Sequence, residues 1–312
     1  MERALVTGGA GFIGSHLVRN LVRDGIAVRI LDNYSSGKPE NLKDLGRKVE
    51  LMEGDVRNAI ACRNACRGVD TVFHLAALVS VPKSVADPVQ SDAINSGGTL
   101  NLLLAARDNS VRRLVFSSSA AIYGNTDIIP TPETVLPCPT SPYGVQKLTG
   151  EHYARNFTHL YGLETVSLRY FNVYGPGQDP TSPYAAAIPK FLMRLLQGNA
   201  PIVFGDGEQT RDFCYVADVV AANRRAAAAP KSSADGSAYN IAGGGRISVN
   251  ELLPRIQATI ATAIPIHYEP SREGDIKHSG ADISAARAFL GHEPATTLEA
   301  GLQESAKYYR SL

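Results

Sequence analysis

The sequence predicts an α/β protein, built on a doubly wound parallel sheet with a smaller, discontinuous C-terminal α/β lobe. Three observations predict it. Strand-like runs alternate with helical stretches up to about residue 170, which implies βαβ units with parallel strands. A glycine-rich turn joins the first strand to the first helix. Beyond about residue 175 prolines become frequent and the elements shorten.

The N-terminal half supplies the strands and helices of the predicted sheet. Strand-like runs occupy residues 3–7, 27–31, 48–53, 70–75, 112–117 and 164–169. Helical stretches occupy residues 12–24, 58–67, 88–108 and 142–161. Gly25, Gly68 and Gly162 each follow a helical stretch, where a left-handed cap favours glycine.

The C-terminal part has shorter elements. Asp206-Gly207 predicts a turn between strand-like residues 202–204 and 211–216. Residues 239–241 predict a further strand, which is a candidate to rejoin the main sheet. Ser248 and Thr297 have the residue type that caps helix N-termini.

Composition and charge exclude several classes of protein. Apolar residues make up 44% and charged residues 20%, as in ordinary globular proteins. The 31 basic and 30 acidic side chains leave a formal charge of +1, so we expect no nucleic-acid or membrane partner. No apolar run reaches about 18 residues, and a strand begins at Arg3, so we expect neither a spanning helix nor a signal peptide. The 4 cysteines lack metal-ligand spacing, which predicts reduced thiols, no metal site and a cytoplasmic protein.

The turn after the first strand has the spacing of a dinucleotide site. Gly9, Gly11 and Gly14 satisfy G-x-G-x-x-G, and Gly8 opens a second, overlapping pattern. Glycines let the backbone approach a pyrophosphate, and the following helix N-terminus offers free N–H groups. Asp32 ends the second strand, where a carboxylate bonds the ribose hydroxyls and repels a 2′-phosphate. The sequence therefore predicts NAD rather than NADP.

Two later strand ends fit the same cofactor. Asp55-Val56 follows the third strand, within reach of an adenine, and Leu75–Ala77 closes the fourth with small residues that permit close contact. His74, inside the fourth strand, is interpreted as a hydrogen-bonded core histidine.

A serine, a tyrosine and a lysine predict a hydroxyl-oxidising site. Tyr143 and Lys147 lie four residues apart at the start of a helix, so they share one face. An ammonium near a phenol favours the phenolate, which would act as a base. Ser119 closes the fifth strand at the carboxyl edge of the sheet, where ligands of this fold class bind. The serine would orient a substrate oxygen and Tyr143 would take its proton.

With these motifs, the chain resembles the extended short-chain dehydrogenase/reductase family, and within it the UDP-hexose 4-epimerases, closest to the UDP-N-acetylglucosamine 4-epimerase group. The resemblance runs from residue 3 to about residue 309. The segments that carry it are Thr7–Gly14, Asp32-Asn33, Ser119–Gly124, Tyr143–Lys147, Arg169–Pro176, Gly205–Phe213 and Arg272–Asp275. It implies a Rossmann domain with bound NAD, a UDP-sugar substrate and epimerisation through a 4-keto intermediate.

The resemblance also implies site residues and a partner. The catalytic residues are Ser119, Tyr143 and Lys147. The cofactor residues are Gly8, Gly11, Phe12, Ile13, Gly14, Asp32, Asn33, Ser36, Gly37, Asp55, Val56, Leu75, Ala76, Ala77, Ser117, Tyr143, Lys147, Tyr170 and Val173. The substrate residues are Ser80, Ser119, Tyr143, Asn172, Ala186, Ala187, Phe191, Phe204, Arg211, Arg272, Asp275 and Ser279. Relatives pair through helices that match 92–107 and 144–161, which implies a homodimer.

The expected domains follow from the motifs and the change in character of the chain. The NAD-binding unit is expected to span residues 1–175, with a returning segment near 237–262. Residues 176–236 and 263–312 are expected to form the substrate lobe.

Individual residues discriminate among nucleotide-sugar enzymes. Dehydratase relatives carry an acid pair where this chain has Ala120 and Ala121, so dehydration is disfavoured. Asp179 would repel a uronate, and Gly177 replaces an arginine that many epimerases carry. Ser279 stands where narrow-specificity epimerases carry a tyrosine, which leaves room for an acetamide. The loop around Ser80 resembles that of the N-acetylhexosamine epimerases. The alternatives are a UDP-uronate 4-epimerase or decarboxylase, and an inactive dinucleotide-binding sensor.

Overall fold

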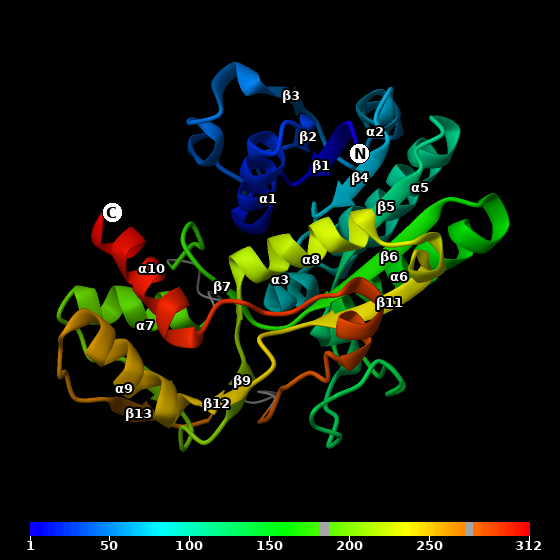
Figure 1. Cartoon of the computed structure of the whole chain (residues 1–312). Helices are drawn as coiled ribbons and strands as arrows, with labels where there is room; N and C mark the ends of the chain where they lie inside the picture. The colour runs from blue at the N-terminus through cyan, green and yellow to red at the C-terminus, as the bar shows by residue number, and fades with distance from the viewer. Residues whose placement is uncertain (181–186, 272–276) are drawn as a thin grey trace.

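A seven-stranded sheet forms the centre of the molecule (Figure 1). The computed structural model describes residues 1–180, 187–271 and 277–312. The strands are β1 (Arg3–Thr7), β2 (Ala27–Asp32), β3 (Val49–Glu53), β4 (Thr71–His74), β5 (Arg113–Ser119), β6 (Glu164–Tyr170) and β11 (Asp235–Ile241). Their order is β11-β6-β5-β4-β1-β2-β3, and each pairing is parallel. The order reverses between β1 and β4, the switch point at which doubly wound sheets bind ligands. The predicted fold class is confirmed.

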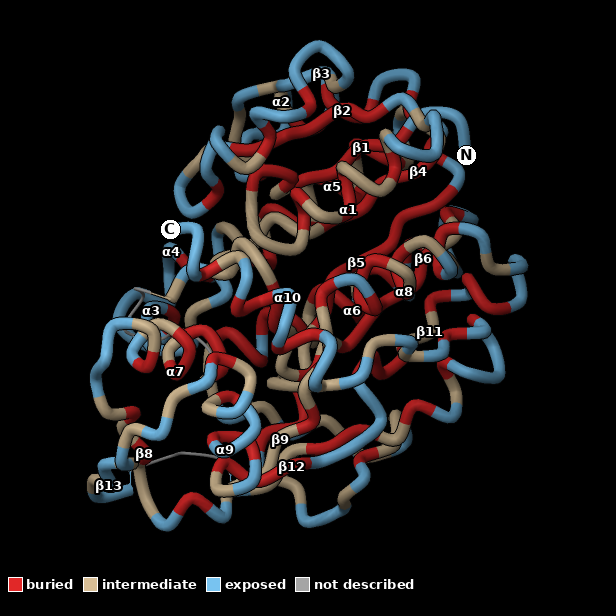
Figure 2. The backbone as a smooth tube through the Cα atoms, turned by 60° about the vertical axis from the view of Figure 1, so that its left-hand side comes forward, coloured by how far each residue is buried: buried red, intermediate tan, exposed pale blue. Residues whose placement is uncertain are grey.

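Helices cover both faces of this sheet. The helices α1 (Phe12–Arg23) and α8 (Val216–Ala228) share one apolar core with strand residues such as Val6. The helices α2 (Ala59–Cys66) and α5 (Gly98–Asp108) share a second core with Leu5, and α6 (Pro142–Tyr161) adds Phe157 to it. Successive strand residues point to opposite faces, so Leu5 and Val6 enter different cores. Figure 2 shows most strands of the sheet as buried backbone between partly exposed helices, whereas the edge strand β3 is largely exposed.

A smaller lobe follows the sheet along the chain. Its core joins α7 (Ala187–Leu196), α9 (Val249–Ile260) and α10 (Leu298–Arg310). Two short ladders flank them: β8 (Ile202–Phe204) with β13 (His267–Glu269), and β9 (Thr210–Asp212) with β12 (Arg246–Ser248). A third ladder joins β7 (Val173–Tyr174) to β10 (Cys214–Tyr215).

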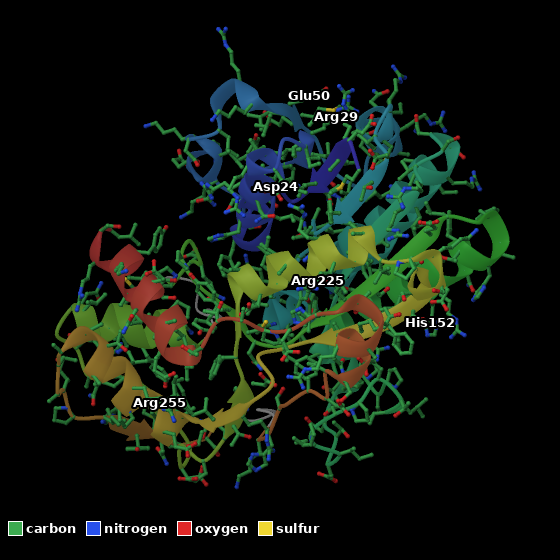
Figure 3. All side chains as sticks on the ribbon, viewed as in Figure 1. Asp24, Arg29, Glu50, His152, Arg225 and Arg255 are labelled. Carbon is green, nitrogen blue, oxygen red and sulfur yellow. The ribbon has the colours of Figure 1, made fainter. Side chains whose placement is uncertain are left out.

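Ion pairs join neighbouring elements of the fold (Figure 3). Arg29 on β2 pairs with Glu50 on β3 at 2.9 Å. Arg255 on α9 pairs with Glu299 on α10 at 2.5 Å. No helix among the described residues is both long and apolar enough to cross a membrane.

Most predicted elements are present within one or two residues of their expected bounds. The strand at 239–241 does rejoin the sheet, as β11 beside β6. Ser248 and Thr297 cap α9 and α10, and Gly25, Gly68 and Gly162 all have positive φ. The single helix expected over 88–108 is instead α4 (Pro88–Asp92), one π-helical turn and α5.

Two helices pack differently from the predicted division into domains. The helix α8 falls inside 176–236, yet its apolar residues belong to the core of the sheet. The helix α9 falls inside 237–262, yet it packs with α7 and α10. The helix α8 connects β10 to β11, which pairs with β6 in the sheet. After β11 the chain enters the lobe through β12. The other domain boundaries stay predictions.

Candidate active site

The glycine-rich turn leaves the start of α1 free to bind an anion. Gly11 is the N-cap of α1, and no described side chain caps the helix there. The first turn of α1, which starts with Phe12 and Ile13, contains no acidic residue. A Cβ on Gly14 would lie 2.1 Å from the carbonyl oxygen of Gly8, and Gly8 itself has φ +70°. Free N–H groups and the positive end of the helix dipole suit a pyrophosphate, so this turn fits the predicted dinucleotide.

The end of β2 presents a fixed carboxylate beside that turn. Asp32 accepts hydrogen bonds from the backbone N–H of Ala10 and of Tyr34, each at 2.9 Å. The Ser36-Gly37 segment packs against the glycine-rich turn, since a Cβ on Gly37 would lie 2.9 Å from Ala10. Backbone donors thus hold Asp32 at the edge where the ribose of a dinucleotide is expected.

Asp55, after β3, belongs to the same edge of the sheet. Asn33 donates from Nδ2 to its carboxylate at 2.7 Å. The guanidinium of Arg57 bonds it as well and lowers the pKa of Asp55 to about 2. Val56, by contrast, lies in the core, where a Cβ on Gly98 would lie 2.6 Å from its Cγ2. Asp55 is therefore a charged, fixed group, while Val56 has an evident packing role.

The end of β4 lies directly against the glycine turn. A Cβ on Gly8 would lie 2.8 Å from the backbone nitrogen of Ala76, so Leu75–Ala77 borders the turn. His74 bonds the hydroxyls of Thr7 and Thr99 at 2.8 and 2.9 Å, and burial lowers its pKa to about 3. It is the neutral core histidine that the sequence predicts.

Ser119, Tyr143 and Lys147 come together at the end of β5. Tyr143 and Lys147 are 8% and 4% exposed. Lys147 donates from Nζ to the carbonyl oxygen of Ser117 at 2.7 Å, and Nζ lies 5.9 Å from the centre of the Tyr143 ring. The side chains of Ser119 and Tyr143 are hydrogen-bonded. The structure thus brings the three predicted residues into one cluster.

Burial controls the ionisation of this cluster. It raises the pKa of Tyr143, and the hydrogen bond with Ser119 opposes that rise. It also lowers the pKa of Lys147 to about 7. The chain alone therefore favours a protonated Tyr143, and a further positive charge nearby is required before it acts as a base at neutral pH.

Tyr170 ends β6, and Val173 begins β7. The Tyr170 hydroxyl is 3.0 Å from Ser117 Oγ and receives a hydrogen bond from Asn223 Nδ2 at 2.8 Å. Tyr170 thereby joins β5, β6 and α8 at the edge where the cofactor is predicted. Val173, in β7, packs against the core of the sheet.

Three predicted substrate residues meet around Asp212, which the sequence analysis did not single out. Asn172, at φ +25°, donates from Nδ2 to the Asp212 carbonyl oxygen at 3.1 Å. The Asp212 N–H donates to the carbonyl oxygen of Ser279 at 3.0 Å, and Arg211 is its neighbour in β9. Its carboxylate accepts from Gly243 N at 2.8 Å, and burial raises the pKa of Asp212 to about 6. In the sequence, the only sign of Asp212 is its position as an acidic residue between Arg211 and Phe213.

The other predicted substrate residues are more scattered. Ala187 opens α7, Phe191 is 7% exposed in the core of the lobe, and Phe204 ends β8. Ser80 caps α3 (Val81–Ala86) by accepting from Lys83 N at 3.3 Å. Ala186, Arg272 and Asp275 lie outside the described residues.

The geometry supports proton removal from a hydroxyl group next to a bound dinucleotide. A substrate oxygen beside Ser119 and Tyr143 would find a hydrogen-bonding partner and a proton acceptor together. The glycine turn, Asp32 and Leu75–Ala77 line the adjacent edge of the sheet. Fold and site together define a dinucleotide-dependent enzyme of the Rossmann class.

Comparison with known proteins gives the family. Residues 4–242 match the NAD dependent epimerase/dehydratase family, and the chain belongs to it. It is 38% identical to a putative UDP-glucose 4-epimerase of Methanocaldococcus jannaschii over 98% of both chains. It is similar to the structure of UDP-N-acetylglucosamine 4-epimerase from Methanobrevibacter ruminantium in complex with UDP-N-acetylmuramic acid (41% identity, TM-score 0.95, 99% and 98% of the chains). The chain is also similar to the structure of UDP-glucose 4-epimerase from Thermotoga maritima with UDP-glucose, at 40% identity and a TM-score of 0.93 over 99% of both chains. UDP-glucuronic acid 4-epimerase from Bacillus cereus, in complex with UDP-glucuronic acid and NAD, is 30% identical (TM-score 0.90, 99% of both).

The protein is thus an NAD-dependent enzyme, and the identity of its cofactor can be measured directly. Denaturing the purified protein and analysing the supernatant by mass spectrometry is expected to release NAD or NADH. The Asp32 carboxylate disfavours a 2′-phosphate, and replacing it with serine should raise the share of NADP. Recovery of mainly NADP from the unaltered protein would contradict the role of Asp32.

Proposed function

We propose that this enzyme is a 4-epimerase of UDP-sugars, acting on UDP-GlcNAc and UDP-GalNAc and also on UDP-glucose and UDP-galactose. The observation that carries the proposal is the Ser119–Tyr143–Lys147 cluster beside the glycine turn. The similarity to UDP-sugar 4-epimerases over nearly the whole chain supports it.

Each member of the cluster has a defined task in this reaction. Ser119 bonds the sugar 4-hydroxyl and directs it toward Tyr143, which accepts its proton. Bound NAD would supply the acceptor for the C4 hydride, the donor that returns this hydride to the opposite face of C4, and a positive charge that favours the phenolate. After the 4-keto sugar has rotated in the site, Tyr143 returns the proton to its C4 oxygen. Lys147, fixed by the Ser117 carbonyl, stabilises the anionic tyrosine.

The substrate lobe has to hold the nucleotide while the sugar turns. Asp212 connects the segments of Asn172 and Arg211. It also hydrogen-bonds the backbone of Gly243 and of Ser279. An arginine guanidinium suits diphosphate oxygens. We therefore assign Asn172 and Arg211 to the nucleotide and diphosphate.

Ser279 supports acceptance of an N-acetylated sugar. Its backbone is paired with β9, since its N–H donates to the Thr210 carbonyl oxygen at 3.0 Å and its own carbonyl oxygen accepts from Asp212. It is thus held beside Arg211 and Asn172, and a small side chain there leaves volume for an acetamide. The serine at position 80 supports this preference less, because its hydroxyl caps α3.

The alternative of a uronate substrate is less well supported. Asp179 places a negative charge after the Tyr174–Pro176 turn, where a uronate carboxylate would be repelled. Gly177 has φ +82°, a conformation that favours glycine over the arginine of many epimerases. The Tyr309 hydroxyl donates to the carbonyl oxygen of Gln178 at 2.7 Å and fixes this loop. Turnover of a panel of UDP-hexoses and UDP-uronates distinguishes the two substrates.

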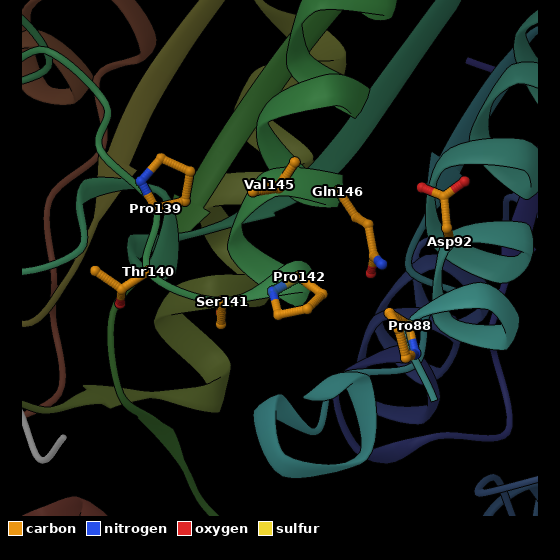
Figure 4. A pocket seen from close by; sticks show the side chains of 8 residues that line it. All are labelled: Pro88, Asp92, Pro139, Thr140, Ser141, Pro142, Val145 and Gln146. Atoms are coloured by element: carbon orange, nitrogen blue, oxygen red, sulfur yellow. The ribbon is translucent and has the colours of Figure 1, made fainter. Parts of the chain in front are cut away.

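We also propose a homodimer that pairs through α5 and α6. An open groove of about 480 Å³ lies between α4 and the start of α6, and Gln146 points across it toward Pro88 and Asp92 (Figure 4). Val145 on α6 is 49% exposed, and Leu160 and Tyr161 at the end of the helix are 71% and 50% exposed. Exposed apolar side chains on one helix favour burial against a second copy.

Light scattering tests the dimer. The protein is expected to have twice its chain mass of 33.3 kDa in solution. Val145→Arg places a charge on the proposed interface and should yield monomers. Leu136→Arg changes an apolar residue that is 84% exposed in a loop after β5 and should leave the dimer intact. A monomeric unaltered protein, or equal effects of both variants, would contradict this interface.

A further inference from the structure

Glu151 lies on the same face of α6 as Tyr143 and Lys147. Positions 143, 147 and 151 are four residues apart, so their side chains form one stripe along the helix. Glu151 is 7% exposed. Gly150 beside it lets the helix approach β5 closely, because a Cβ there would lie 2.4 Å from the Phe116 ring. The stripe therefore faces the end of β5, which carries Ser117 to Ser119.

Partners on two neighbouring strands hold the Glu151 carboxylate. Arg169 on β6 donates from Nε at 2.9 Å and from Nη2 at 2.7 Å. The Ser118 hydroxyl on β5 donates at 2.5 Å. Ser118 and Arg169 are direct partners in the β5–β6 register. Replacing such a buried pair with apolar residues of similar size would avoid the cost of removing both charges from water. Stability alone therefore does not account for the Glu151–Arg169 pair.

The state of Lys147 gives Glu151 a second task. The Lys147 ammonium lies 5.0 Å from the centre of the Phe116 ring, and its Nζ donates to the Ser117 carbonyl oxygen. Burial lowers the pKa of Lys147 to about 7, and among the described residues the Glu151 carboxylate opposes this effect. A buried lysine without such a counter-charge loses its proton more readily.

We propose that Glu151 is a positioning residue of the active site, which keeps Lys147 charged and fixes the end of β5 beside Tyr143. Ser118, bonded to Glu151, lies between Ser117, whose carbonyl accepts from Lys147, and Ser119, which bonds Tyr143. One carboxylate thereby controls the charge of Lys147 and the placement of Ser119. The inference rests on the proposed function, because the charge of Lys147 matters where Tyr143 exchanges a proton with substrate.

A second buried ion pair joins the same two strands and provides a matched control. Glu164 begins β6 and pairs with Arg113, at the start of β5, at 2.6 Å. The side chains of Arg113 and Glu164 are 2% and 16% exposed. This pair lies at the opposite end of the strands from Lys147. Glu164→Gln therefore weakens the β5–β6 pairing without touching the active site.

The first test is Glu151→Gln, which removes the charge and keeps the shape. The pKa of Lys147 is expected to fall by about one unit or more. NMR of the holoenzyme with ¹³Cε-labelled lysine measures it, and the Lys147 signal is identified by its loss in Lys147→Met. The basic limb of the kcat–pH profile should shift to lower pH by a similar amount. At about pH 8, kcat should fall roughly tenfold or more with a smaller change in KM. Glu164→Gln should change neither the Lys147 titration nor the profile.

A second variant guards against misfolding, because Glu151→Gln leaves Arg169 buried without its partner. Glu151→Gln/Arg169→Met removes both charges and is compared with Arg169→Met alone, because the Arg169 guanidinium itself disfavours the Lys147 ammonium. The pKa of Lys147 is expected to be lower in the double variant than in Arg169→Met, and equal values in these two variants overturn the proposal. Equal losses of kcat in Glu151→Gln and Glu164→Gln also overturn it. The titration needs no substrate, so a shifted Lys147 in a protein inactive on UDP-sugars would contradict the proposed function alone.

Discussion

Replacing Tyr143 by phenylalanine is expected to lower kcat by at least ~10² while NAD stays bound. The substitution removes the hydroxyl that exchanges a proton with the sugar and keeps the buried ring beside Lys147. Because the tyrosine is 8% exposed and bonded to Ser119, bulk water is poorly placed to replace it. Steady-state kinetics, together with the NAD content of the denatured variant, measure both effects.

Tyr239→Phe is the matched control for this prediction. Its hydroxyl donates to the Ser233 carbonyl oxygen at 3.1 Å, in the core beside α8 and away from the cluster. It should cost some stability and leave kcat near that of the parent. Near-normal turnover by Tyr143→Phe would mean that another group accepts the proton, and the assignment of Tyr143 would be wrong.

The second large effect is expected from Ser279→Tyr. A tyrosine beside Arg211 and Asn172 would occupy the volume that an acetamide needs, and overpacked sites tolerate such overlap poorly. The ratio of kcat/KM for N-acetylated over plain UDP-hexoses should fall by about 10- to 100-fold. UDP-glucose and UDP-galactose should still turn over, since a 2-hydroxyl requires less room.

A substitution at Ser284 separates this effect from general damage. Ser284 is exposed and lies in the same C-terminal segment, so Ser284→Tyr should leave all four substrates unaffected. Unchanged use of UDP-GlcNAc by Ser279→Tyr would show that Ser279 does not line the sugar pocket. A uniform loss on all four sugars would argue against a role in selectivity.

Local patterns in the sequence predict the fold and the centre of the site. The alternation of strands and helices requires a parallel sheet, and the glycine turn between β1 and α1 identifies the binding edge. Tyr143 and Lys147 are predictable because a spacing of four places them on one helix face. The same spacing reaches Glu151, and a search of the helix for a buried counter-charge would have found it.

Features that depend on distant contacts are not predictable in this way. Asp212 unites Asn172, Gly243 and Ser279, which are far apart in the chain and come together only in the folded lobe. The packing of α8 on the sheet and of α9 in the lobe follows from the path of the chain between strands. The low pKa of Lys147 results from burial that no spacing reveals.

The measurement that tests the account most directly is turnover of UDP-GlcNAc by the purified holoenzyme without added reductant or oxidant. Products are separated by chromatography and their configuration at C4 is read by NMR. The account predicts that UDP-GlcNAc and UDP-GalNAc interconvert to an equilibrium mixture reached from either side, with no net change in NAD redox state. A UDP-sugar panel that shows no 4-epimer from any hexose, while a uronate is epimerised or decarboxylated, would contradict it.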